Sequence, residues 1–139
     1  MPRVLAVVLA LALIGLAVAW PRINDVETGR TPEYPELTPR QYAQGEPAVT
    51  QATRAAIERL PRWSVGGTGK GPGGSEVQAV AGTPIGLKHD VTVRIRREGS
   101  GTRVSIRSRS RNGPWDFGQN ARNIHVLLDQ LELELKKVR

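Results

Sequence analysis

Between residues 88 and 111 the sequence alternates apolar and polar positions on both sides of one short turn. A period of two is typical of β-strands, because successive side chains of a strand point to opposite faces. The glycine-containing turn from Glu98 to Gly101 joins the two runs and predicts a β-hairpin. One face of this hairpin is apolar and must be covered by a second layer of structure. Its residues are Val91, Val93, Ile95, Val104 and Ile106.

Two amphipathic segments are suited to form that layer. The first begins near Pro47, which fits the first turn of a helix, and ends before Pro61. The second begins with Asp116 and Gln119, which are spaced as in a capping box. Its apolar residues recur at intervals of three and four, as expected of a helix that packs on a sheet. They are Phe117, Ala121, Ile124, Leu128, Leu131 and Leu135.

Two further strands are predicted at 62–65 and 76–82, on either side of a glycine-rich loop from Gly66 to Gly74. The expected fold class is therefore a small α+β domain, in which an antiparallel sheet of three to four strands packs with two helices. We expect this domain to span residues 48–139. It would follow a proline-rich connector at 21–47, where the prolines favour a stiff and irregular chain.

The N-terminal segment is an apolar run from Val4 to Trp20. Its length is close to the thickness of a bilayer core, so residues 1–20 are predicted to form an N-terminal transmembrane helix or an uncleaved signal. Ala17-Val18-Ala19 resembles a signal-peptidase site and leaves a released, exported domain open. A retained anchor would place the chain in the bacterial inner membrane with its domain in the periplasm. The expected anchor residues are Val4, Leu5, Leu11, Leu13, Ile14, Leu16 and Trp20.

Composition excludes several kinds of chemistry. The chain has no cysteine and two histidines, which excludes disulfides, thiolate metal sites and a cysteine nucleophile. Phosphate-binding patterns in the glycine-rich segment lack the residues and the following helix that they require. Each histidine is interpreted as a lone surface residue, because nothing in the sequence places a serine beside either ring. We therefore predict no catalytic residue, no metal site and no cofactor, and we do not expect an enzyme.

Three parts of the chain resemble a known family. They are Ile23-Asn24-Asp25-Val26-Glu27-Thr28, the stretch from Asp90 to Ile95, and Arg107-Ser108-Arg109-Ser110-Arg111-Asn112-Gly113 followed by Asp116-Phe117-Gly118-Gln119-Asn120-Ala121-Arg122. Over roughly residues 23–133 the chain is similar to the uncharacterised domain-of-unknown-function family 1499. The resemblance implies an exported or membrane-attached protein of bacteria or plastid-bearing organisms, and it implies no activity. Asp116, Asn120 and Arg111 are interpreted as structural residues of this motif.

Positive charge is concentrated on the predicted hairpin. Eight residues between 88 and 111 are Lys or Arg, and two are acidic. Strand alternation puts five of the arginines on the face opposite the apolar one, namely Arg94, Arg96, Arg103, Arg107 and Arg109. Two interpretations stay open for this arginine face. Either Arg107 or Arg109 pairs with Asp116 inside the domain, or the face docks on an acidic partner.

These observations predict a non-catalytic, membrane-anchored accessory or stabilising subunit of a larger respiratory or photosynthetic membrane complex. It would dock through the arginine face and through Trp115, whose alternative role is to cover the edge of the core. Expected partners are other subunits of the complex, the lipid bilayer and anionic lipid. Nucleic acid is not expected, because the hairpin lacks aromatic residues on which bases could stack. The alternative function is a free-standing exported domain that binds anionic lipid or a small ligand.

Overall fold

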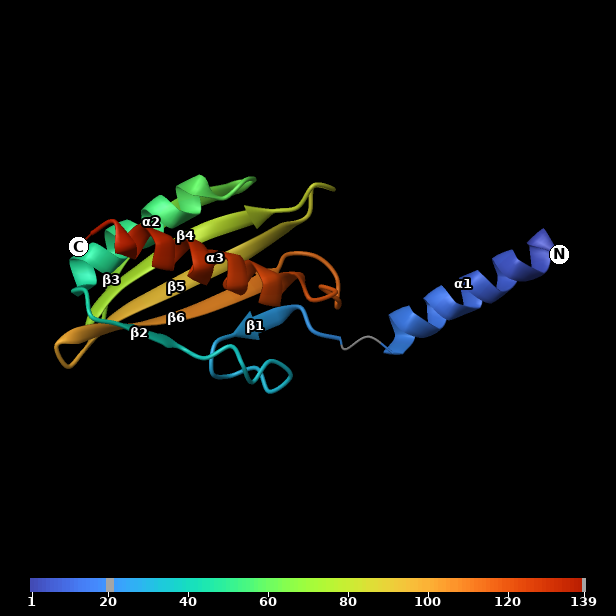
Figure 1. The fold of residues 1–139 in the computed structure, drawn as a ribbon, viewed down its shortest axis with the longest axis horizontal. Helices are drawn as coiled ribbons and strands as arrows, with labels where there is room; N and C mark the ends of the chain where they lie inside the picture. The colour runs from blue at the N-terminus through green and yellow to red at the C-terminus, as the bar shows by residue number, and fades with distance from the viewer. Residues whose placement is uncertain (20–21, 139) are drawn as a thin grey trace.

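The computed structural model describes residues 1–19 and 22–138 of the chain. A first helix is followed by two short strands, a second helix, four longer strands and a C-terminal helix (Figure 1). In chain order the elements are α1 (Pro2–Ala19), β1 (Asp25–Glu27), β2 (Arg40–Tyr42), α2 (Glu46–Arg59), β3 (Trp63–Gly71), β4 (Gly74–Gly82), β5 (Lys88–Glu98), β6 (Gly101–Ser110) and α3 (Gln119–Lys136).

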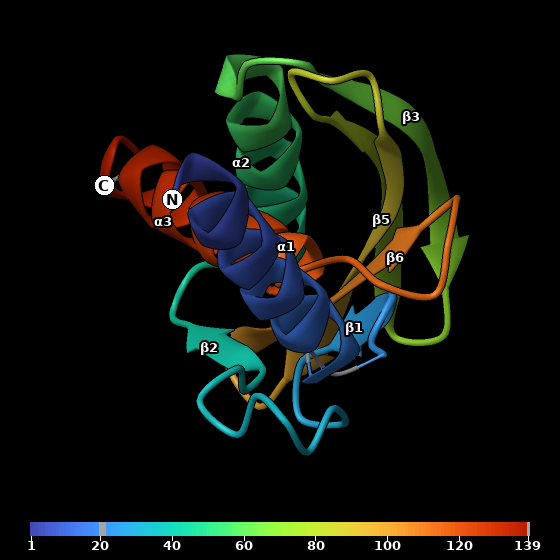
Figure 2. The same ribbon diagram turned by 90° about the vertical axis from the view of Figure 1, so that its right-hand side faces the viewer.

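The strands form one antiparallel sheet in the order β1-β6-β5-β4-β3. Strand β2 also pairs with β6, on the same edge as β1. Helices α2 and α3 lie side by side on one face of the sheet, and Figure 2 shows the other face uncovered. The body of the protein therefore has two layers, with the core between helices and sheet. Helix α1 lies apart from this body (Figure 1).

The sheet is larger than the sequence predicted. Within the described residues it has six strands rather than three to four, and three helices accompany it. Both additional strands come from the proline-rich segment 21–47, where β1 pairs with residues 107–109 of β6 and β2 pairs with residues 102–104. Strands of three residues are too short to show a period of two in the sequence. They exist because β6 offers them an edge on which to pair.

The predicted glycine-rich loop is largely a strand. β3 runs through it as far as Gly71, with one irregularity between Val65 and Thr68, and pairs with β4. Glycine is needed at Gly74 because the neighbouring strand β5 lies very close to it. A Cβ at this position would overlap the backbone oxygen of Ile95. The turn between the strands contains Gly73 with a φ of +74°, a conformation that favours glycine. The glycines therefore mark a tight hairpin.

The apolar face of the β5–β6 hairpin lies in the core, as predicted, and each of its five residues is at most 1% exposed. Helix α3 covers this face with the predicted stripe from Ala121 to Leu135. Phe117 is the exception, because it precedes α3 and is 50% exposed. The chain turns sharply at this point, where Phe117 has a φ of +50° and Gly118 a φ of +79°. The apolar stripe therefore begins one helical turn later than predicted.

Helix α1 does not form the predicted membrane anchor. In residues 1–19 and 22–138 no helix is both long and apolar enough to cross a membrane. The 18 residues of α1 include Pro2 and the charged Arg3. This finding overturns the transmembrane helix and the inner-membrane, periplasmic location that depended on it. Of the predicted anchor residues, Trp20 lies outside the described residues, and the others are exposed on α1, namely Val4, Leu5, Leu11, Leu13, Ile14 and Leu16.

Candidate functional site

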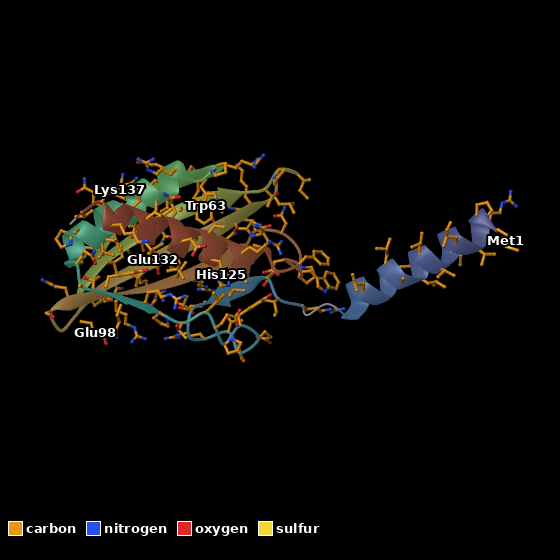
Figure 3. The ribbon with its side chains drawn as sticks, in the orientation of Figure 1. Met1, Trp63, Glu98, His125, Glu132 and Lys137 are labelled. Atoms are coloured by element: carbon orange, nitrogen blue, oxygen red, sulfur yellow. The ribbon has the colours of Figure 1, made fainter. Side chains whose placement is uncertain are left out.

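A cluster of polar side chains lies inside the core at one end of the sheet. His89 of β5 and Ser110 of β6 are opposite each other in the register, and Ser108 is the next core-facing residue of β6. Asn120 in the first turn of α3 completes the cluster and is fully buried. His89 is 3% exposed, so the prediction that it is a surface residue was wrong. The β5–β6 turn, where Figure 3 labels Glu98, is at the other end of the sheet.

Asn120 joins the strands to α3 through both ends of its amide. Its Nδ2 donates to the backbone oxygen of Asn24 at 3.0 Å and to Ser110 Oγ at 2.9 Å. Its Oδ1 accepts from Ser108 Oγ at 2.7 Å and lies 3.0 Å from His89 Nδ1. A backbone oxygen can only accept, so the contact with Asn24 assigns Nδ2 and Oδ1 of the amide. It follows that His89 Nδ1 carries a hydrogen and donates it to Asn120.

A cavity of about 350 Å³ opens beside this cluster. Its walls come from the segment between β4 and β5, from the paired ends of β5 and β6, and from the segment that leads into α3. The rim faces solvent, since Ile85 is 81% exposed and Phe117 is 50% exposed. Most of the surface area of the lining is apolar. The apolar residues that provide it include Pro84, Ile85, Leu87, Trp115 and Phe117. This combination of an apolar wall and a few polar groups is typical of small-molecule sites.

Two residues of the cavity lining each have a buried ring nitrogen without a hydrogen-bond partner. The two atoms are Nε2 of His89 and Nε1 of Trp115. Within the described part of the chain, Nε of Arg40 is the other buried side-chain atom in this condition. A buried polar atom without a partner costs ~1–3 kcal/mol, which makes such atoms rare in folded proteins. Both atoms are also closed to solvent, so neither is an open hydrogen-bonding position on the cavity wall.

The N-terminal segment holds the loop that carries Trp115. Asn24 Nδ2 donates to the backbone oxygen of Gly113 at 2.9 Å, and the backbone nitrogen of Asp116 donates to Ile23 at 2.9 Å. The guanidinium carbon of Arg22 lies 5.0 Å from the centre of the Trp115 ring, within the range of a cation–π contact. Trp115 is therefore fixed between the chain entering the domain and the cavity. Its predicted roles, docking or covering the edge of the core, stay predictions.

Asp116 caps α3, and it does not pair with an arginine as one interpretation of the sequence proposed. Its carboxylate accepts from the backbone nitrogen of Gly118 at 2.8 Å and from that of Asn120 at 3.3 Å. Arg107 instead binds Asp25 on β1, with an Nε–Oδ1 distance of 2.9 Å. These hydrogen bonds hold the pKa of Asp25 below its ordinary value, against the opposing effect of burial. The sequence could not indicate this pair, because β1 was not expected in the sheet.

The other arginines of the arginine face also have partners on neighbouring strands. Arg94 forms ion pairs with Glu27 at 3.1 Å and Glu76 at 3.8 Å. Arg103 pairs with Glu98 at 3.9 Å. The sequence suggested that nothing nearby neutralises Arg94 and Arg103, but the sheet brings acids from three other places beside them. A docking role for this face stays a prediction, and it would compete with these exposed pairs.

Two positions of the face make other contacts. Arg96 donates from Nη1 to the backbone oxygen of Ser75 at 3.0 Å. Arg109 lies between Asp25 and Asp90 in the register, and its charge lowers the pKa of both carboxyl groups. Arg111, one of the predicted structural residues, donates to Asp90 at 2.8 Å and is the main cause of the lowered pKa of Asp90.

The contacts of His89 differ from those of a serine–histidine–acid set. A serine–histidine–acid set needs the serine and the acid on opposite ring nitrogens. Here Ser110 Oγ lies 3.1 Å from Nδ1, on the same ring edge as Asn120. Asn120 is neutral, so it orients the ring without the negative charge that would stabilise a protonated imidazole. His125, the second histidine, is exposed on the outer side of α3 (Figure 3).

His89, Ser108 and Ser110 were not predicted as site residues, although the sequence held a signal for each. His89 has the same strand parity as Val91, and both serines have the same parity as Ile106. The alternation that placed the valines in the core therefore also placed these three polar residues there. A buried polar side chain needs a partner, and that requirement points to a common contact. The cavity itself had no such signal, because loops form its walls.

Two of the three parts of the sequence that carried the family resemblance meet at this site. Asn24, the two serines and Asn120 come from separate parts of the chain and share one hydrogen-bonded cluster. The protein is thus an α+β domain whose helical layer is fastened to its sheet by this cluster. The family model described as "Protein of unknown function (DUF1499)" matches residues 16–131, and the chain belongs to this family. No curated protein matches the chain.

Proposed function

We propose that this protein is a non-catalytic binding domain that takes up a small, mainly apolar ligand in the cavity at the start of α3. The observation that supports this proposal is the mainly apolar surface of the cavity, to which Ile85, Leu87 and Phe117 contribute while they stay exposed to solvent. A cavity of about 350 Å³ is within the usual range for small-molecule sites. Of the two functions expected from the sequence, this is the ligand-binding alternative.

The two walls of the cavity are held by different contacts. The segment between β4 and β5 is tied by the backbone nitrogen of Leu87, which donates to Thr83 Oγ1 at 3.0 Å, and it contains exposed Ile85. The opposite wall is held by the hydrogen bonds of the buried cluster around Asn120. Apolar side chains exposed on one wall gain most when a ligand removes them from water.

Binding can be tested with 1-octanol as the probe and the full chain as the protein. We expect the indole N–H resonance of Trp115, assigned with Trp115→Phe, to shift and saturate as the probe is added. The resonance of Trp63, on β3 and outside the cavity lining, provides the internal reference. A shift that grows linearly without saturation, or one that affects both tryptophans equally, would rule the binding site out.

A matched pair of variants tests where the probe binds. Leu87 lines the cavity and Val126 on α3 does not, and the two are 44% and 42% exposed. Leu87→Trp adds volume inside the cavity and should weaken binding by about tenfold or more, since a filled site loses the contacts of the ligand. Val126→Trp adds the same side chain elsewhere and should leave the affinity unchanged. Equal effects of the two changes would contradict the proposed site.

A further inference from the structure

We propose that a second cavity, between α2 and β3, binds an elongated zwitterion, whose ammonium group contacts Glu46 and whose carboxylate group contacts Arg54. This cavity has a volume of about 400 Å³, and its lining comes from one side of α2, from β3 and from the beginning of β4. It shares no lining residue with the cavity at the start of α3. The inference therefore goes beyond the proposed function and does not depend on it.

Glu46 supplies a buried negative charge to the second cavity. It is 7% exposed, and its Oε1 accepts from the hydroxyl groups of Ser75 and Thr50, two other residues of the lining. The hydrogen bond from Ser75 is the main reason why the pKa of Glu46 stays below its ordinary value, against the opposing effect of burial. The carboxyl group is therefore ionised near neutral pH.

The other carboxylate oxygen of Glu46 is open. Within residues 1–19 and 22–138, Oε2 has no hydrogen-bond partner, yet it is not one of the buried atoms closed to solvent. In the same residues Glu46 forms no ion pair. A buried charge is normally paired with an opposite charge. An ammonium group that enters the cavity would supply that partner at Oε2.

Arg54 supplies a positive charge further along the same side of α2. Glu46, Thr50 and Arg54 are spaced by four residues, so they lie on one face of the helix. Arg54 Nη1 donates to Thr68 Oγ1 on β3, and this is its one side-chain hydrogen bond in the described part of the chain. A guanidinium group has five N–H donors and suits a carboxylate. Arg54 can therefore bind a ligand carboxylate while it keeps Thr68.

The register of β3 and β4 sets the separation between these two charges. Ser75, which donates to Glu46, is paired with Lys70 in the register. Thr68, which accepts from Arg54, lies two residues before Lys70 and therefore on the same face of the sheet. Ser75 and Thr68 are thus diagonal neighbours, which lie about 7–8 Å apart in an antiparallel pair. One ligand can contact both charged groups if its own charges are separated by a similar distance.

The charges of the lining favour a zwitterion over an ion of one sign. Lys70 also lines the cavity and is exposed. A simple cation would be repelled by Arg54 and Lys70, and a simple anion would be repelled by Glu46. 6-Aminohexanoate is a suitable probe, because a chain of methylene groups separates its ammonium group from its carboxylate group.

The experiment compares four probes by calorimetric titration of the full chain near pH 7 at low ionic strength. The probes are 6-aminohexanoate, hexylamine, hexanoate and glycine. Hexylamine lacks the carboxylate, hexanoate lacks the ammonium group, and glycine has both charges but is too short to contact both residues. Because each charge-assisted hydrogen bond contributes strongly, we expect 6-aminohexanoate to bind about tenfold or more tightly than each of the other three.

Variants assign the two charges of the probe. Glu46→Gln keeps an oxygen that accepts from Ser75 and removes the charge, and Arg54→Gln removes the guanidinium group. Each should weaken the binding of 6-aminohexanoate about tenfold or more. Glu58→Gln is the matched control, because Glu58 is exposed on α2 outside the lining, and it should leave the affinity unchanged. If Glu46→Gln fails to fold, Arg54→Gln and the comparison of probes still decide the question.

Three results would overturn the inference. They are equal affinities for 6-aminohexanoate and hexylamine, an affinity that Arg54→Gln leaves unchanged, and the absence of saturable binding of 6-aminohexanoate. None of them concerns the uptake of 1-octanol by the cavity at the start of α3, so the proposed function fails or stands by its own test.

Discussion

Asn120→Ala is the substitution that most directly tests the buried cluster. The side chain is fully buried and contacts Asn24, Ser108, Ser110 and His89. Each of these contacts contributes about 1 kcal/mol net, and their loss leaves buried polar atoms without partners. We therefore expect Asn120→Ala to lower the free energy of unfolding by about 3–5 kcal/mol. A loss of this size is a large fraction of the ~5–15 kcal/mol that stabilises a typical domain.

The assay is equilibrium unfolding of the full chain in urea, followed by tryptophan fluorescence. The slope of the unfolding free energy against urea should stay constant if the change affects stability alone. Ser108→Ala removes one member of the cluster, which contacts Asn120 and Asn123, and should cost ~1–2 kcal/mol. Asp129→Ala changes an exposed residue of the same helix and should stay within about 0.5 kcal/mol of the unmodified chain.

The losses of stability in the three variants should decrease in the order Asn120→Ala, Ser108→Ala, Asp129→Ala. If Asn120→Ala costs no more than Ser108→Ala, the amide of Asn120 does not join strands and helix as described. If Asp129→Ala lowers the free energy of unfolding as much as Asn120→Ala does, any substitution in α3 destabilises the protein to that extent. The buried contacts of Asn120 would then contribute no more than an exposed residue. The first result would also remove the basis for assigning the hydrogen of His89 to Nδ1.

Two further predictions concern the sheet. Gly74→Ala should destabilise the protein by ~2 kcal/mol or more, because its Cβ would overlap the backbone oxygen of Ile95. Gly69→Ala places its Cβ in open space and should change the stability by no more than about 1 kcal/mol. Thermal unfolding of both variants checks this, and equal melting temperatures would contradict it. The second prediction is acid sensitivity at Asp25. Because Arg107 lowers the pKa of folded Asp25 below 3.8, its stabilising effect is present above that pH and is lost as the pH falls further. Asp25→Asn should therefore be less stable than the unmodified chain near neutral pH, and the difference should shrink in acid; unfolding curves at a series of pH values that stay parallel would refute it.

The long strands and α3 could be predicted because their periodicity is strong. A period of two assigned Val91, Val93 and Ile95 to the core, and a helical period did the same for Leu128 and Leu131. These patterns reflect one physical requirement, the burial of one face of each element, and the structure meets it. Local sequence therefore sufficed for the elements that build the core.

Contacts between distant segments could not be predicted. One interpretation of the sequence paired Arg107 or Arg109 with Asp116, which is close in sequence, but Arg107 pairs with Asp25, 82 residues away. The pairing of β1 with β6 creates this contact. A strand of three residues is too short for its sequence pattern to predict that pairing. The candidate site depends on the same kind of meeting between remote residues. For this reason its serines and His89 were visible as buried positions but not as one cluster.

The two short strands on β6 have a consequence for how the sheet meets its surroundings. An unpaired edge strand exposes backbone groups that can recruit another chain into an aggregate. β1 and β2 share the outer edge of β6, covering residues 107–109 and 102–104, so this central hairpin strand never becomes an edge. The remaining edge is β3, whose glycines and irregular register make it a poor template for a second chain. A piece of this protein that begins at residue 48 would keep every long strand and lose this protection against self-association.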